Sequence, residues 1–294
     1  LWTILRLMDG QRTIASINTE LTEDLIDLAA QLLASLAEAG VVDISGRPFG
    51  RFLHEISKNG VLPNGGLAND DICQLVTDGN YRAYPDKPRV PVRTDIPERL
   101  APFFEITRNR RSPWAFIDRP VAGPDFDALL TTGCGVTGEL NWERGDVKLR
   151  AYPSGGGLYA VEIFPIVFSM EGLKPAVYHY RPVENILEMM RPDINRSLML
   201  DAALPAQREI LPGVAVMVCL TGMFVRFERK YGEGSNRIIA AEAGHIAQNL
   251  VLAATALGLH ARPCGGFFDE LINKAIGLDT EHEQFLLSVL IGHA

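Results

Sequence analysis

Three consecutive glycines stand directly before a long apolar run in the stretch RAYPSGGGLYAVEIFPIVF, residues 150–168. Glycine weakens a strand through backbone entropy, so a dense group of glycines usually marks a place where another group approaches the main chain closely. The stretch is neither GxGxxG opening a helix nor GxxxxGK followed by Ser or Thr, which excludes two nucleotide fingerprints. We expect a strand over 158–168. Taken alone, the glycines favour a bulge or a tight strand entry.

Composition and charge exclude several classes of protein. The chain has 294 residues, of which 47% are hydrophobic and 22% charged, as in soluble globular proteins. No apolar run is long enough to span a bilayer, and no signal-peptide pattern opens the sequence. The net charge of −8, without a basic run, argues against nucleic acid as a partner. The cysteines form no CxxC pair and the histidines lack ligand spacing, so we expect no metal and a cytoplasmic protein.

The chain divides into three predicted regions. Residues 1–44 predict a small winged-helix-like module, whose two basic and seven acidic residues favour a peptide contact or structural packing over DNA. Residues 45–103 predict a connector with peripheral structure and one helix near Asp70–Val76. Residues 104–294 predict an α+β domain. Its expected elements are helices over 124–134 and 239–257 and strands over 158–168, 214–220 and 285–291.

Two further stretches bear on what the glycines contact. In TRNRRSPWAF, residues 107–116, Arg110, Arg111 and Ser112 stand side by side. Guanidinium groups suit bidentate phosphate contact and the hydroxyl adds a hydrogen bond, although a solvated arginine cluster near a helix end explains this run equally well. In RPCGGFFDE, residues 262–270, Gly265 and Gly266 interrupt an apolar context and on their own indicate a simple turn.

Taken in this order, the three stretches resemble the flavin-dependent nitroreductase family, in which corresponding segments surround one FMN. More narrowly, the sequence resembles the SagB-type azoline-oxidase branch through YPSGGGLYAVEIF, VYHYRP, KYGEGSNR, EAGHIAQNLVLAATALGL and VLIGHA. The resemblance covers about residues 104–294. It implies a nitroreductase-like FMN-binding fold, with a central, mostly antiparallel sheet flanked by helices. It also implies an intertwined homodimer with the helix over 239–257 at its centre.

The resemblance assigns the residues around FMN. The glycine stretch would contact the flavin from the partner subunit, its bare backbone lying against the isoalloxazine ring, through Pro153, Ser154, Gly155 and Gly157. The flavin N5 side would face Gly265 and Gly266. The ribityl-phosphate would be held by Arg110, Arg111 and Ser112. Family members usually carry a further basic residue beyond the final strand, whereas this sequence ends at Ala294, so we expect either that the segment is omitted from the sequence or that fewer groups hold the phosphate.

The resemblance also places a catalytic pair at Lys230 and Tyr231. Oxidation of an azoline ring removes a hydride, which flavin N5 accepts, and a proton, which needs a base. Because lysine titrates near ~10.4, Lys230 would have to be desolvated or crowded by cations to act as that base. The candidates for crowding are Arg226, Arg229 and Arg237. A solvated surface charge is the other interpretation of Lys230, and His179 is expected to be a satisfied strand histidine.

We therefore expect an FMN-dependent dehydrogenase that converts thiazoline or oxazoline rings in a modified peptide to thiazole or oxazole. It would work beside a cyclodehydratase, with oxygen reoxidising the flavin. Three alternatives stay open: an NAD(P)H-dependent nitroreductase or quinone reductase, an oxidase of carrier-bound heterocycles in nonribosomal peptide synthesis, and a flavin-free scaffold that only binds peptide.

Overall fold

The computed structural model describes residues 82–142, 145–192, 194–278 and 282–294, together with positions 21, 25, 26 and 31. The predicted N-terminal module, apart from these four positions, and the helix expected near Asp70–Val76 lie outside the described residues.

A six-stranded sheet forms the centre of the described chain, in the order β5-β4-β3-β6-β8-β7, and each neighbouring pair is antiparallel. Its strands are β3 (Val161–Val167), β4 (Ala176–Arg181), β5 (Ile186–Pro192), β6 (Val216–Met223), β7 (His260–Cys264) and β8 (Glu283–Gly292). A separate hairpin, β1 (Val136–Trp142) with β2 (Gly145–Arg150), precedes the glycine stretch.

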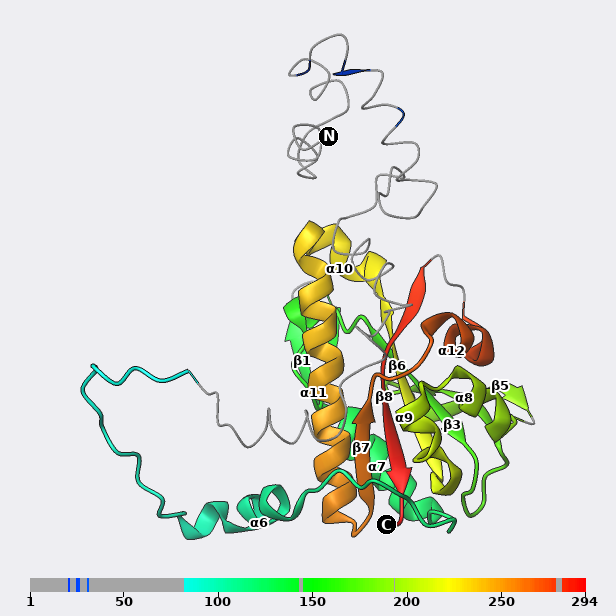
Figure 1. Ribbon diagram of the computed structural model, residues 1–294, viewed down its shortest axis with the longest axis horizontal. Coiled ribbons are helices and arrows are strands. Elements are labelled where there is room, and N and C mark those ends of the chain that lie inside the picture. The colour runs from blue at the N-terminus through cyan, green and yellow to red at the C-terminus, as the bar shows by residue number, and fades with distance from the viewer. Residues whose placement is uncertain are drawn as a thin grey trace.

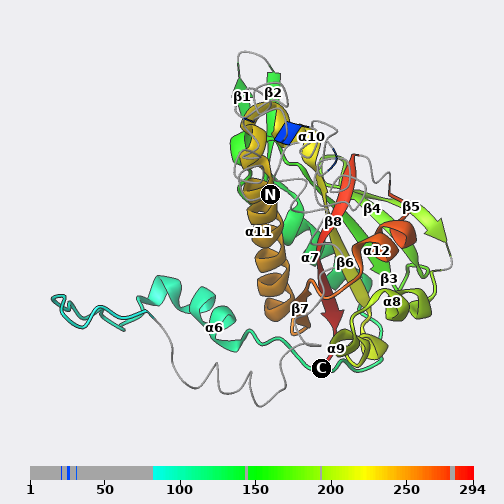
Figure 2. The ribbon, with the colours of Figure 1, turned by 45° about the horizontal axis from the view of Figure 1, so that its top comes forward.

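Helices cover both faces of the sheet, and each face has its own hydrophobic core. One face packs against α7 (Gly123–Cys134) and α11 (Ser235–Ala256), and the other against α8 (Arg196–Ala202) and α12 (Asp269–Ile276) (Figures 1 and 2). Short helices α9 (Pro205–Arg208) and α10 (Phe224–Tyr231) complete this body. Because β3 and β6 are buried on both faces, their sequences are continuous apolar runs rather than alternating patterns.

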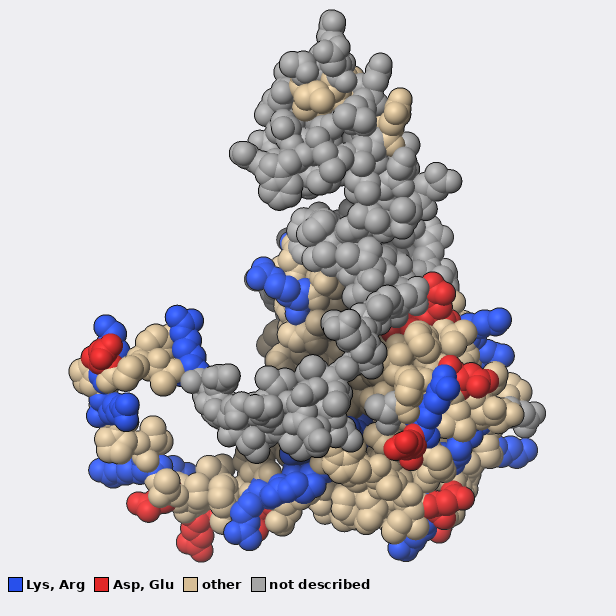
Figure 3. Space-filling model, viewed as in Figure 1, with Lys and Arg blue, Asp and Glu red and all other residues tan. Residues whose placement is uncertain are grey.

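The chain reaches this body through an extended segment, residues 82–97, and α6 (Ala101–Asn109). Figure 1 shows this segment standing away from the sheet, and Figure 3 shows Lys and Arg side chains along it. Within the described residues, no helix combines the length and the apolar character that crossing a bilayer would require.

The predicted fold class is confirmed, and the helices expected over 124–134 and 239–257 are α7 and α11. The strands expected over 214–220 and 285–291 are β6 and β8. The strand expected over 158–168 begins later, at Val161, because Gly155–Gly157 forms a 3₁₀ turn and Tyr159 takes a left-handed backbone conformation. Strands β5 and β7 and the β1–β2 hairpin were not predicted, and β4 was anticipated only through the expectation that His179 lies in a strand.

Candidate active site

The glycine turn, Gly155–Gly157, packs against side chains of α10 and α11. A Cβ atom on Gly155 would lie 2.6 Å from Cγ2 of Ile238 and 3.2 Å from Cε1 of Phe227. Gly157 has a φ of 67°, in the left-handed region, and a Cβ atom there would meet nothing within 4 Å. Contacts within the chain therefore explain the absence of a side chain at position 155, whereas at 157 the backbone conformation does, and that side of the turn is open.

Lys230 and Tyr231 form the last turn of α10 and lie against the same glycine turn. A Cβ atom on Gly156 would overlap the Lys230 ammonium and lie 3.0 Å from the Tyr231 hydroxyl. The ammonium is also 5.3 Å from the centroid of the Tyr231 ring. Helix α10 holds the pair there because Phe224 and Phe227 are buried, and the Tyr231 ring packs against that of Phe227 with centroids 5.7 Å apart. The structure thus brings the predicted catalytic pair to the predicted flavin loop.

The surroundings of Lys230 differ from those expected. Lys230 is exposed in this chain. Arg226, one of the arginines expected to crowd it, forms an ion pair with Glu162 at 2.7 Å and donates to the Tyr159 carbonyl at 2.8 Å. Its charge is therefore compensated by a carboxylate, and the described contacts leave Lys230 exposed to solvent.

Arg110, Arg111 and Ser112 follow α6 directly. The Arg111 Nη1 donates to the carbonyls of Arg108 and Arg110 at 2.7 Å each, and the Arg110 Nη1 lies 3.3 Å from the Ser112 hydroxyl. Arg111 thus caps the C-terminal end of α6. The three side chains form a compact group of hydrogen-bond donors at a helix end, a geometry that also suits the alternative of a solvated arginine cluster.

Gly265 and Gly266 follow β7. A Cβ atom on Gly265 would make one ordinary contact, 3.8 Å from Cδ1 of Leu287, whereas on Gly266 it would overlap the side-chain amide of Gln207. Within β7, Arg262 donates to the Pro113 carbonyl at 3.0 Å, and its Cζ lies 4.4 Å from the centroid of the Trp114 ring. The segment after the arginine run is therefore attached to β7.

The two halves of the predicted site lie toward opposite ends of α11. Pro153 and the glycine turn contact its N-terminal half at His245 and Ile238. Helix α6, with the arginine run after it, lies beside the C-terminal half (Figure 1). A helix of 22 residues is about 33 Å long. Within one chain, the structure joins the glycine turn to Lys230 and Tyr231 but does not bring the arginine run to them.

Sequence reasoning missed a row of polar residues on α11, which we call the polar stripe: Glu242, His245 and Asn249. These residues are spaced i, i+3 and i+7 and so share one face of the helix. Each contacts the main chain of residues 151–161, the segment that carries the glycine turn. The helix is otherwise rich in alanine and aliphatic residues, so this spacing of polar residues is the sequence feature that could have revealed the polar stripe.

His179 is the satisfied strand histidine that we expected. Its Nε2 lies 3.2 Å from Glu162 and its Nδ1 lies 3.1 Å from Glu188, on the two neighbouring strands. Hydrogen bonding to Glu162, opposed by burial and reinforced by Glu188, raises the pKa of His179. The ring also packs against Phe164, with centroids 4.9 Å apart. These contacts explain His179 as part of the sheet.

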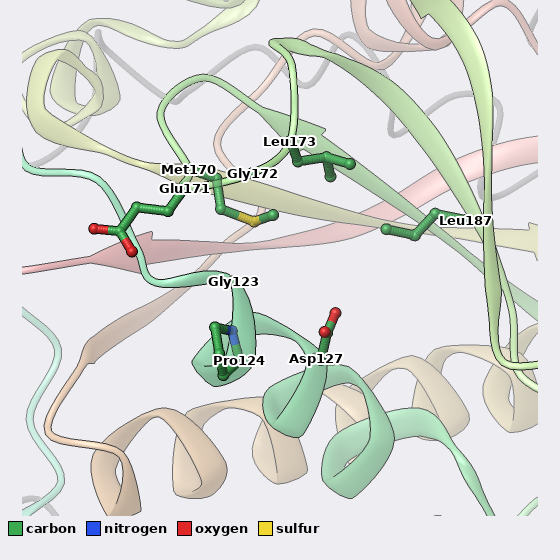
Figure 4. A pocket seen from close by; sticks show the side chains of 8 residues that line it. All are labelled: Gly123, Pro124, Asp127, Met170, Glu171, Gly172, Leu173 and Leu187. Atoms are coloured by element: carbon green, nitrogen blue, oxygen red, sulfur yellow. The ribbon is translucent and has the colours of Figure 1, made fainter.

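A cavity of about 460 Å³ lies between the start of α7 and the β3–β4 turn (Figure 4). In Figure 4, Asp127 points into this space, whereas Glu171 points away from it. The cavity is lined by Gly123, Pro124, Asp127, Met170, Glu171, Gly172, Leu173 and Leu187. None of the predicted site residues belongs to it.

Comparison with known proteins identifies similar chains. The sequence model of the nitroreductase family matches residues 107–293. A Methanocaldococcus jannaschii protein named as a nitroreductase, MJ1384, is 29% identical over 187 residues, 63% of this chain and 88% of that protein. The microcin B17-processing protein McbC of Escherichia coli is 33% identical over 135 residues, 44% of this chain and 49% of McbC. The match thus spans about half of McbC.

A solved structure extends the likeness along almost the whole chain. It is the E. coli microcin synthetase McbBCD complex with truncated pro-MccB17 bound. The alignment has a TM-score of 0.59 and covers 97% of this chain and 98% of the matched chain. At 19% identity, this likeness concerns the fold alone.

Proposed function

The chain belongs to the nitroreductase family of oxidoreductases, and we propose that it is an FMN-dependent dehydrogenase that oxidises azoline rings in a modified peptide. Its products would be thiazoles or oxazoles. The observation that carries this proposal is the contact of Lys230 and Tyr231 with the glycine turn, since a base beside the cofactor loop is what azoline oxidation requires. The match to McbC, a peptide-processing protein, supports the SagB-type branch.

The residues present fit FMN, which members of this family typically bind. The open side of Gly157 and the nearly uncontacted Cβ direction of Gly265 leave bare main chain where a flat ring could lie. Arg110, Arg111 and Ser112 offer clustered donors of the kind that bind phosphate. We infer that Pro153, Ser154, Gly155, Gly157, Gly265 and Gly266 would hold the ring system and that the arginine run would hold the phosphate.

Bound FMN would supply the hydride acceptor, and the chain's own residues would handle the proton. The neutral Lys230 amine would take the proton from the ring carbon at Nζ, while the Tyr231 hydroxyl would orient the azoline heteroatom or the lysine. Because Lys230 is exposed, the peptide and a second subunit would have to exclude water from it, which favours the neutral amine. The buried face of α10 would keep both groups on the turn during the reaction.

We further propose that the site is shared between two copies of the chain. The separation of the glycine turn from the arginine run along α11 supports this, because a second copy would supply the missing half. The exposed face of α11 carries small residues that permit close helix approach: Ala240, Ala241 and Gly244. The extended segment leaves Val90 and Val92 86% and 89% exposed, as expected of an arm that packs on a partner.

Azoline rings form when a peptide side chain closes on the backbone with loss of water, so a cyclodehydratase must supply the substrate. We propose that this chain works beside such an enzyme. Its fold neighbour comes from a synthetase complex with a bound peptide precursor, which supports the proposal.

A spectroscopic experiment tests the function. We expect the purified chain to be yellow, and its flavin absorbance to bleach under anaerobic conditions when a thiazoline-containing peptide is added. The relative named as a nitroreductase favours a second candidate, an NAD(P)H-dependent nitroreductase or quinone reductase. Rapid bleaching by NADPH without peptide would favour that candidate. A colourless chain that does not bind added FMN would contradict both.

A further inference from the structure

We propose that the polar stripe of α11 positions the glycine turn, and that Glu242 is the positioning residue on which the shape of the turn most depends. This inference rests on the proposed function where it concerns FMN. It assigns a role to residues that contact neither the predicted catalytic pair nor the open side of Gly157, and it concerns the conformation of residues 151–161.

The polar stripe holds this segment at both of its ends. Near the beginning, the Asn249 amide donates to the Ala151 carbonyl at 3.0 Å, and the His245 Nδ1 lies 3.3 Å from the Pro153 carbonyl. At the end, the Val161 amide donates to Oε1 of Glu242 at 3.0 Å. One rigid helix face thus fixes where the segment enters and leaves.

The segment between these points has a backbone that needs support. Gly156 and Gly157 have φ values of 63° and 67°, and Tyr159 has a φ of 48°. A non-glycine residue in the left-handed region is strained, and such strain persists where the surrounding contacts over-determine it. Three left-handed residues within four positions therefore need hydrogen bonds and packing contacts from other parts of the chain to hold them.

Tyr159 is bonded through each of its polar groups. Its amide donates to the Ser154 hydroxyl at 2.8 Å, its carbonyl accepts from Arg226 at 2.8 Å, and its hydroxyl accepts from the Arg150 amide at 3.0 Å. The Arg150 guanidinium lies 4.8 Å from the centroid of the Tyr159 ring. These contacts hold the strained residue from three directions.

Glu242 joins the polar stripe to this framework. It is 1% exposed and accepts from the Val161 amide at the end of the segment. Burial raises the pKa of Glu242, while hydrogen bonding to the Ser154 hydroxyl and to Val161 lowers it in part. Glu242 thus holds Val161 directly, at the end of the segment in which Ser154 accepts from the Tyr159 amide.

The test compares Glu242→Leu with the conservative Glu242→Gln, which keeps an acceptor for Val161. Leu250→Ala is the matched control, because Leu250 is buried on the same helix but packs against Gly133 of α7. Two quantities are measured in the full chain: the rate of amide hydrogen exchange in residues 151–161, and the Kd for FMN from fluorescence titration. Exchange does not require flavin, so it tests the polar stripe even if FMN binding fails.

We expect Glu242→Leu to speed exchange in residues 151–161 at least tenfold relative to the six-stranded sheet and to weaken FMN binding at least tenfold. Glu242→Gln should stay within about threefold of the wild type in both. An exchange rate in Glu242→Leu equal to that of the wild type would overturn the proposal. It would also be overturned if Leu250→Ala lost as much FMN affinity as Glu242→Leu. If Glu242→Leu does not fold, His245→Ala and Asn249→Ala should still speed exchange in this segment, and unchanged rates in both would overturn it. A wild-type chain that binds no FMN would contradict the proposed function alone.

Discussion

Lys230 lies so close to Gly156 that any side chain at that glycine would displace its ammonium group. The two residues belong to different elements, the last turn of α10 and the 3₁₀ turn before β3. Their contact makes the glycine turn and the Lys230–Tyr231 pair one structural unit. A change in the turn therefore moves the lysine, and the chemistry of the pair can be tested at either residue.

Replacing the lysine tests its role as the base. We expect Lys230→Gln to keep FMN and to lower azoline oxidation by roughly 10²- to 10⁴-fold, the usual contribution of a general base. Flavin content is measured by absorbance and turnover by conversion of a thiazoline peptide. Lys274→Gln, at an exposed lysine on α12, is the matched control and should leave turnover unchanged. Undiminished turnover in Lys230→Gln would remove this residue from the mechanism.

Replacing the first glycine tests the packing beneath the turn. Gly155→Val would force its side chain into Ile238 and Phe227, and overpacking of this kind costs about 1–3 kcal/mol. We expect a chain that is less stable to urea and purifies without flavin colour. The control is Gly138→Ala in β1, where the added atom would lie 3.8 Å from Leu149. A Gly155→Val protein with full flavin absorbance would show that this turn does not hold FMN.

His179 predicts a dependence of stability on pH. Its pKa is raised in the fold, chiefly by hydrogen bonding to Glu162, so the protonated ring favours the folded state. This stabilisation is complete below the unfolded value near ~6.5 and is lost as the pH rises through the raised value. The free energy of unfolding of the wild type, relative to His179→Gln, should therefore fall as urea titrations move from acid to alkaline pH. We expect a change on the order of 1 kcal/mol. A constant difference would show that the ring is not protonated in the fold.

Gly244 tests the proposed dimer. It is exposed on α11, and an added Cβ atom would meet nothing within 4 Å, so Gly244→Glu fits the single chain. Replacing glycine within a helix should preserve or raise the thermal stability of the protomer by up to about 1 kcal/mol. We expect light scattering to report a monomer without flavin, whereas Lys274→Glu on α12 should stay dimeric. A dimeric, yellow Gly244→Glu protein would place the interface elsewhere.

The sequence was informative where apolar pattern decides the structure. β3, β6 and β8 follow continuous apolar runs because they are buried, and α7 and α11 follow helical spacing. β4 and β5 were less visible because their polar residues are paired across strands, as with His179 and Glu188. Such pairs satisfy charges that, in sequence, resemble exposed loops.

The site could be predicted from the sequence only in part, because its contacts join segments that are far apart along the chain. The resemblance singled out Gly155, Gly157 and Lys230, but the contact between the glycine turn and the lysine depends on how α10 packs. The glycines were expected to admit a flavin ring, whereas at positions 155 and 156 they admit side chains of the same chain. Glu242 accepts from a main-chain amide 81 residues earlier, and no residue pattern marks such a partner.

The glycine turn and the arginine run lie toward opposite ends of α11, which implies that two different inactive variants can restore activity when they form a mixed dimer. If each cofactor takes its loop from one protomer and its phosphate ligands from the other, a mixed dimer of Lys230→Gln and Arg111→Ala chains would contain one site with both defects and one intact site. Two inactive proteins, unfolded and refolded together, would then regain up to about half of the wild-type activity per mixed dimer.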